Sequence, residues 1–112
     1  MEFERIVSDV YKRPNAYGLN GGYREFVAFL NGVNAASEGR LLDGFSASLA
    51  NRLGGGGNLY WALLVAQLAL APRLVRHLGE ITEADQSRVV DVLFRELGEF
   101  VKSRPGPFPA GD

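Results

Sequence analysis

The chain has 112 residues, 46% of them hydrophobic, and a net charge of −1 from 12 basic and 13 acidic side chains. This length fits one domain, and the lack of any charged block argues against nucleic acid or an anionic membrane as a partner. The absence of cysteine excludes disulfides, thiolate chemistry and cysteine-bound zinc. The charged N-terminal segment does not have the basic start and apolar run of a signal peptide, so we expect a cytoplasmic protein.

Two amphipathic helices are predicted in the first third of the chain. Apolar side chains recur at steps of three and four residues over residues 3–13 and again over residues 23–37. Between them, residues 14–22 hold three glycines, two asparagines and a proline, a composition typical of a loop. Gly32 would cost about 1 kcal/mol relative to alanine inside a helix. We therefore expect either a break at Gly32 or another helix packed closely against it.

The middle of the chain contains the most apolar segment. A helix with leucine, phenylalanine and small residues is predicted over residues 41–53, and the glycines at 54–57 predict a flexible hinge or a tight reversal. Residues 59–71 contain one polar side chain, Gln67, and predict a helix buried on nearly all sides, with Asn58 as its N-cap. This helix would be roughly 20 Å long, shorter than the ~30 Å core of a bilayer, so a membrane span is not expected.

The C-terminal third is predicted to end in one long helix. Residues 72–79 predict one or two helical turns closed by the glycine at their end. Thr82 and Asp85 form a variant of the capping box, which predicts a helix over residues 83–103. Residues 104–112 contain three prolines and two glycines and predict a flexible tail.

These elements together predict the fold class. We expect an all-α, single-domain bundle of about five helices within residues 1–103, packed around the buried helix at 59–71.

No group of residues predicts catalysis or metal binding. His77 is the only histidine and has no second metal ligand three or four residues away, so a solvated role is expected. Glu80, Glu83 and Asp85 surround a helix start, where carboxylates are stabilising in any case. The glycines at 54–57 lack the Lys-Ser or Lys-Thr of a phosphate-binding loop. We therefore predict no catalytic residue, no metal and no cofactor.

The loop after the first helix is the best candidate for contact with another protein. Tyr17 lies in this glycine-rich segment between two arginines, and tyrosine and arginine are enriched at protein interfaces. The sequence therefore predicts a non-enzymatic protein-binding module whose contact residues are Arg13, Tyr17, Asn20, Tyr23 and Arg24.

Two alternatives remain open. A small-molecule-binding protein or small enzyme would have a pocket formed by Asn58, Tyr60 and Trp61 together with Tyr17. A structural homodimer would be built by the last helix or by the helix at 41–53.

Four short motifs resemble a pattern found in small, uncharacterised bacterial proteins, some of which are immunity-type partners of secreted toxins. The resemblance implies that the chain inhibits a bacterial toxin by binding it, and it implies no catalytic residue. The motifs are Arg13-Pro14-x-x-Tyr17-Gly18, Phe29-Leu30-x-Gly32-x-Asn34, Gly44-Phe45 and Asn58-Leu59-x-Trp61.

Overall fold

The computed structural model describes residues 2–56 and 59–103. In these ranges the chain contains helices and no strand, which confirms the all-α bundle. The elements are α1 (Phe3–Lys12), η1 (Pro14–Tyr17), α2 (Tyr23–Ala36), α3 (Phe45–Leu53), α4 (Trp61–Leu70), η2 (Leu78–Glu80), η3 (Glu83–Asp85) and α5 (Gln86–Ser103), where η marks a short 3-10 helix.

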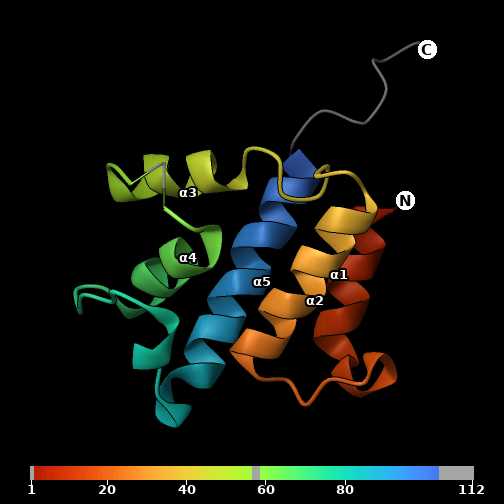
Figure 1. Ribbon diagram of the computed structural model, residues 1–112, viewed down its shortest axis with the longest axis horizontal. Coiled ribbons are helices and arrows are strands. Elements are labelled where there is room, and N and C mark those ends of the chain that lie inside the picture. Colours follow the sequence, from red (N-terminus) through yellow and green to blue (C-terminus); the bar gives the residue numbers. More distant parts are fainter. Residues whose placement is uncertain (1, 57–58, 104–112) are drawn as a thin grey trace.

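The helix at the centre of the bundle is α5. It contacts each of the other four α-helices. Figure 1 shows α1 and α2 on one side of α5, α4 on the other side, and α3 across one end. With 18 residues α5 is about 27 Å long, whereas the ten residues of α4 span only about 15 Å. The predicted central helix, α4, is therefore a buried neighbour of the true centre, α5, which is the longest described helix and contacts the other four.

Helix α4 begins two residues later than predicted. Its N-cap is Tyr60, which has extended backbone angles, and both Leu59 and Tyr60 are nearly half exposed. Six of its ten residues are buried, while Leu63 and Leu68 are partly buried against the core. The predicted N-cap, Asn58, lies outside the described residues.

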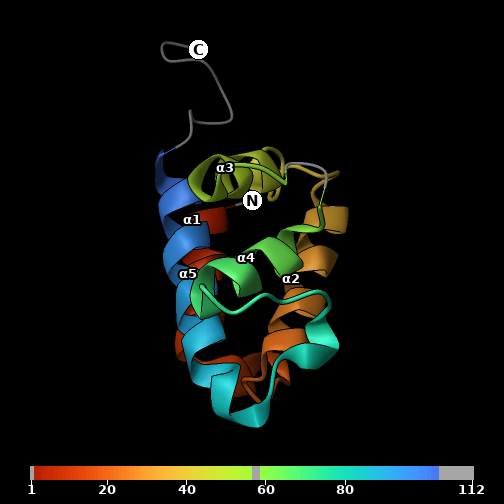
Figure 2. The same ribbon diagram turned by 90° about the vertical axis from the view of Figure 1, so that its left-hand side faces the viewer.

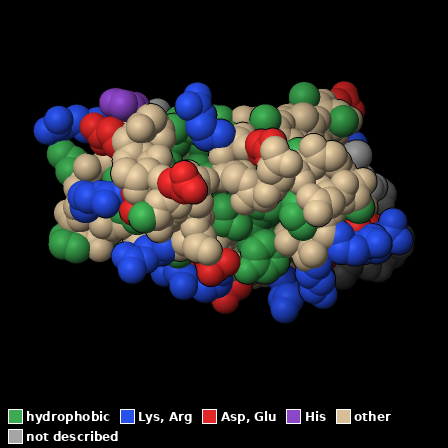
Figure 3. Space-filling model, turned by 90° about the horizontal axis from the view of Figure 1, so that it is seen from below, with side chains coloured by type: hydrophobic (Ala, Val, Ile, Leu, Met, Phe, Trp, Pro, Cys, Tyr) green, Lys and Arg blue, Asp and Glu red, His purple; other side chains and the backbone are tan. Residues whose placement is uncertain are grey.

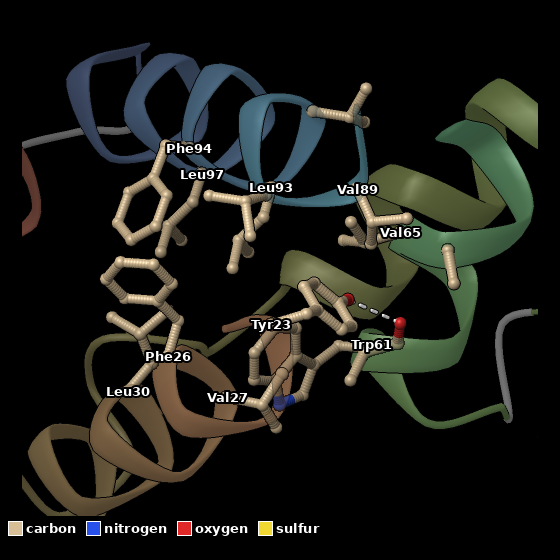
Figure 4. Packing of buried hydrophobic residues seen from close by; sticks show 14 of the residues in the cluster. Tyr23, Phe26, Val27, Leu30, Trp61, Val65, Val89, Leu93, Phe94 and Leu97 are labelled. Carbon is tan, nitrogen blue, oxygen red and sulfur yellow. Dashed lines mark hydrogen bonds between the residues drawn. The ribbon is translucent and has the colours of Figure 1, made fainter. Parts of the chain in front are cut away.

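Tyr23 is part of the core, so its predicted role as a partner contact is wrong. Its side chain is 0% exposed and points from α2 toward α4 and α5 (Figure 4). Its hydroxyl donates a hydrogen bond to the backbone carbonyl of Ala62 at 2.6 Å, which provides the partner that a buried tyrosine needs. Burial also raises the pKa of Tyr23. A side chain enclosed in this way cannot contact another protein.

Gly32 neither breaks α2 nor marks a close helix contact, so both predictions for this residue are wrong. The helix continues through it to Ala36. A Cβ atom placed at Gly32 would meet no atom within 4 Å apart from its chain neighbours and the backbone of its own helix. The packing of this chain therefore gives no reason for a glycine at this position.

Helix α3 begins later than predicted, at Phe45. Gly44 precedes it with a φ of +86°, a left-handed conformation that side-chain-bearing residues rarely adopt. Residues 41–44 form turns instead of the predicted helical turn.

Residues 71–77 do not form the predicted helical turns. The Nε2 of Gln67 donates to the carbonyl of Arg73 at 2.8 Å, and its Oε1 accepts from the backbone N–H of Val75 at 3.0 Å. After a turn at Ala71 and Pro72, these bonds hold the segment beside α4 in a non-helical path. The glycine that was expected to close a helix lies within η2.

The predicted capping box is confirmed. The backbone N–H of Thr82 donates to the Oδ2 of Asp85 at 2.9 Å. Within the described ranges no helix is long and apolar enough to cross a membrane. The predicted tail at 104–112 lies outside these ranges.

Candidate protein-binding surface

The Arg-Pro-x-x-Tyr-Gly motif forms a tight corner between α1 and α2. Pro14 opens η1, where its lack of an N–H costs nothing. Gly18 closes η1 with a φ of +77°, and its N–H donates to the carbonyl of Asn15 at 3.1 Å. The next N–H, that of Leu19, donates to the carbonyl of Pro14 at 3.0 Å. The backbone of this corner is therefore fixed by its own hydrogen bonds.

The carboxylate of Asp9 joins the two predicted contact residues of this corner. Arg13 donates from Nε to Oδ1 at 3.0 Å and from Nη2 to Oδ2 at 2.8 Å. The hydroxyl of Tyr17 donates to the same Oδ2 at 2.5 Å. Bidentate arginine–carboxylate pairs are geometrically specific, so Asp9 sets the orientation of both side chains.

These hydrogen bonds also determine the protonation states of Asp9 and Tyr17. The bonds from Arg13 and then Tyr17 hold the pKa of Asp9 below its ordinary value. The bond to Asp9 raises the pKa of Tyr17 above its ordinary value. At neutral pH Asp9, Arg13 and Tyr17 are therefore a carboxylate, a guanidinium and a neutral phenol, and the positive charge of Arg5 also acts on Asp9 and Tyr17.

Tyr17 stays accessible although its hydroxyl is bound. Its ring packs edge-on against Phe29 of α2 with centroids 5.2 Å apart, and 37% of the residue is exposed. The side chain of Arg13 is 67% exposed. Seen from this end of the molecule, hydrophobic side chains reach the surface in the middle of the face, and lysine and arginine side chains line one long edge (Figure 3).

The other two predicted contact residues flank the corner. The backbone N–H of Asn20 donates to the Oε1 of Glu25 at 2.5 Å, which ties the end of the loop to the first turn of α2. Arg24 is exposed on that same turn. Arg13, Tyr17, Asn20 and Arg24 therefore all lie at the surface around the α1–α2 connection, as a contact site requires.

The structure does not bring Tyr17 together with the residues of the predicted ligand pocket. Asn31 of α2 donates to the hydroxyl of Tyr60 at 2.6 Å and accepts from the Nε1 of Trp61 at 3.1 Å. Tyr17 contacts Phe29, which is two residues before Asn31 and therefore roughly 200° away around the helix. Tyr17 and the Tyr60–Trp61 pair thus lie on opposite sides of α2.

Trp61 is itself only 6% exposed, so it belongs to the core. An open, shallow depression occurs elsewhere, on the outer face of α3, and neither Tyr60 nor Trp61 lines it.

Two acidic residues that matter to the structure were missed by sequence analysis. Asp9 precedes Arg13 by four residues on a predicted helix. This spacing favours an ion pair, so the pair could have been predicted from the sequence. Glu96 is 7% exposed on α5 and is held by Arg52 of α3 and by the neighbouring Arg95. No local sequence pattern predicts that Glu96 is buried and paired, because its main partner is 44 residues away.

Among residues 2–56 and 59–103, no three histidine, cysteine or acidic side chains are grouped so that they could hold a metal ion. No protein-family model, no curated protein and no solved structure matches this chain. The resemblance to immunity-type proteins therefore stays a prediction.

Proposed function

We propose that this chain is a non-enzymatic protein that acts by binding another protein through the corner formed by Arg13, Tyr17 and Asn20. The observation that carries the proposal is the shared carboxylate of Asp9. It holds an arginine and a tyrosine in defined orientations and leaves both accessible.

Fixed orientation favours binding for an energetic reason. Ordering a flexible side chain at an interface costs about 0.5–1.5 kcal/mol. Arg13 and Tyr17 are already ordered by Asp9 and Phe29, so most of this cost falls on folding and not on association. Tyrosine and arginine are also the residue types that dominate binding hot spots.

The charge of the corner suggests how the partner is recognised. Asp9 balances Arg13, and the nearby Arg5 leaves the corner slightly positive, which disfavours a strongly basic partner surface. The exposed ring of Tyr17 and the free donors of Arg13 suit a partner surface with an apolar recess beside carbonyl or carboxylate oxygens. We propose a secreted bacterial toxin as the partner class, which the resemblance described above implies.

Site-specific photo-crosslinking in the source organism tests the proposal. A photoreactive phenylalanine analogue would replace Tyr17 in one variant and Leu74 in a control. Leu74 is 64% exposed and lies on the segment after α4, away from the corner. We expect a discrete protein adduct with the probe at position 17 and none at position 74. Identical adducts at both positions, or none at position 17, would refute binding through the corner.

A growth assay tests the partner class. The candidate toxin would be the product of an adjacent gene, expressed with and without this chain. We expect the chain to restore growth, Tyr17→Ala to lose that protection, and Leu74→Ala to keep it. Failure of the wild-type chain to protect, combined with a crosslink at position 17, would reject a toxin and retain protein binding.

A further inference from the structure

The acidic side chains around the connection between α1 and α2 are already bound within the chain. The carboxylate of Asp9 accepts three hydrogen bonds, two from Arg13 and one from the hydroxyl of Tyr17. The carboxylate of Glu25 accepts from the backbone N–H of Asn20 at 2.5 Å and from its Nδ2 at 3.5 Å. Both carboxylates are therefore engaged in holding the loop in place.

The arginine side chains at this surface still have unused donors. Arg13 binds Asp9 through Nε and Nη2, whereas its Nη1 donates to no residue that the structure describes. Arg5 precedes Asp9 by four residues, so the two are neighbours on one face of α1. The side chains of Arg5 and Arg24 are exposed, and neither forms a hydrogen bond or an ion pair within residues 2–56 and 59–103.

The charge of Arg5 acts on the corner itself. The bonds from Arg13 and Tyr17 lower the pKa of Asp9, and the charge of Arg5 adds to this effect. The bond to Asp9 raises the pKa of Tyr17, and the charge of Arg5 opposes that rise. Both effects require Arg5 to lie close to the two groups. A partner that covers Arg13 and Tyr17 therefore also covers or borders Arg5.

Covering these cations without a counter-charge would disfavour binding. Asp9 cancels one cation of the corner and leaves Arg5 and Arg24 unbalanced. Glu2 and Glu4 lie near Arg5 in the sequence, but neither forms an ion pair with it. A cation that loses water at an interface and gains no partner is strongly unfavourable. The negative charge that balances the surface must therefore come from the partner.

We propose that the partner presents an acidic side chain to this corner, with its carboxylate bound by Nη1 of Arg13 and attracted by Arg5. The inference rests on the proposed function, because it specifies the chemistry of the partner at the same surface. A backbone carbonyl could accept the bond from Arg13, but it would leave the charge of Arg5 unbalanced. The exposed ring of Tyr17 contacts the partner beside the carboxylate. Opposite charges on the two surfaces also speed their encounter.

Competition for the crosslink at position 17 tests the proposal. A trace of the chain with the photoreactive residue at position 17 is mixed with lysate of the source organism and with increasing amounts of a competitor chain that lacks the probe. The competitors are the wild type, Arg5→Gln, Arg5→Lys and, as the matched control, Arg76→Gln. Arg76 is also exposed and forms no ion pair with a described residue. It belongs to segment 71–77, which lies in front in Figure 2, whereas α1 lies behind the other helices.

Halving the adduct should take about tenfold more Arg5→Gln than wild type, because this variant lacks the charge. Arg5→Lys and Arg76→Gln should each stay within about twofold of the wild type. Raising NaCl from about 0.1 to about 1 M shortens the Debye length from about 10 to about 3 Å, so it should weaken the wild type more than Arg5→Gln. Equal Tm values by circular dichroism would show that all four chains are folded.

Two results would overturn the acidic partner and leave the proposed function intact. In the first, an adduct forms at position 17 and Arg5→Gln competes for it as well as the wild type. In the second, Arg5→Lys competes as weakly as Arg5→Gln although it keeps the charge. The absence of any adduct at position 17 would reject both proposals together.

Discussion

Replacing Arg52 by methionine tests how α3 is held on the bundle. Glu96 is nearly buried on α5; its Oε1 accepts from Arg52 Nη1 at 2.5 Å, and its Oε2 accepts from Arg95 Nη2 at 3.2 Å. Methionine keeps most of the apolar stem of Arg52 but removes the guanidinium. The variant therefore measures what the charge contributes, with little change in packing.

The expected cost follows from the exposure of the three side chains. Removing one partner of a fully buried ion pair costs about 3–5 kcal/mol, because a buried charge is left uncompensated. The side chain of Arg52 is 52% exposed, and Arg95 still binds the second oxygen of Glu96. We therefore expect Arg52→Met to lower the free energy of unfolding by about 1–2 kcal/mol. For a domain of this size that is a fall in Tm of roughly 4–8 °C.

Urea unfolding followed by circular dichroism measures this change, provided that the slope of the transition is the same in all variants. Arg95→Met is the matched control and should cost less than about 1 kcal/mol, because its contact is longer and equally exposed. The double variant should cost more than the sum of the two, since Glu96 would then be buried without a partner. A loss below about 0.5 kcal/mol for Arg52→Met would refute the view that this ion pair holds α3.

Three further changes test other parts of the structure. Tyr17→Phe removes one of the two residues that donate hydrogen bonds to Asp9, so the pKa of Asp9, followed by NMR titration, should rise but stay below its ordinary value because Arg13 remains. Asp85 has its pKa lowered from 3.8 to about 2, first by Arg73 and then by the capping box. Its contribution to stability is therefore complete above pH 3.8 and lost as the pH falls toward 2. In Asp85→Asn the urea midpoint should therefore change less with pH over this range than in the wild type. Leu97→Ala, at a position that is 0% exposed, should cost about 2–5 kcal/mol in urea unfolding; a loss below that range would place Leu97 outside the core.

The spacing of apolar residues was sufficient to predict the helices that have one buried face. Helices α1, α2 and α5 lie within two or three residues of the predicted ranges. Thr82 and Asp85 marked the approach to α5 correctly, because capping is decided by residues three apart. Local chemistry of this kind is fully present in the sequence.

The main errors have a different origin, since they depend on contacts that reach beyond neighbouring turns of one helix. Tyr23 follows a glycine-rich loop and resembles an exposed loop aromatic, yet it is buried by a carbonyl of α4 and side chains of α5. The segment after α4 has helical spacing, but two hydrogen bonds from Gln67 hold it beside that helix in a non-helical path. Of the predicted contact site, Arg13, Tyr17, Asn20 and Arg24 lie at the surface together, whereas the Asp9 carboxylate that organises the first two was missed.

The central position of α5 has a consequence for synthesis of the protein. Helices α1 to α4 precede α5 in the chain, so they leave the ribosome before the element that they all pack against. At a synthesis rate of about 5–20 residues per second, roughly 2–7 s pass between completion of α4 and completion of α5. During this time Leu64, Val65 and Leu70 have no complete core to enter. The nascent chain therefore exposes these apolar side chains until α5 emerges, and the core can be completed only after that.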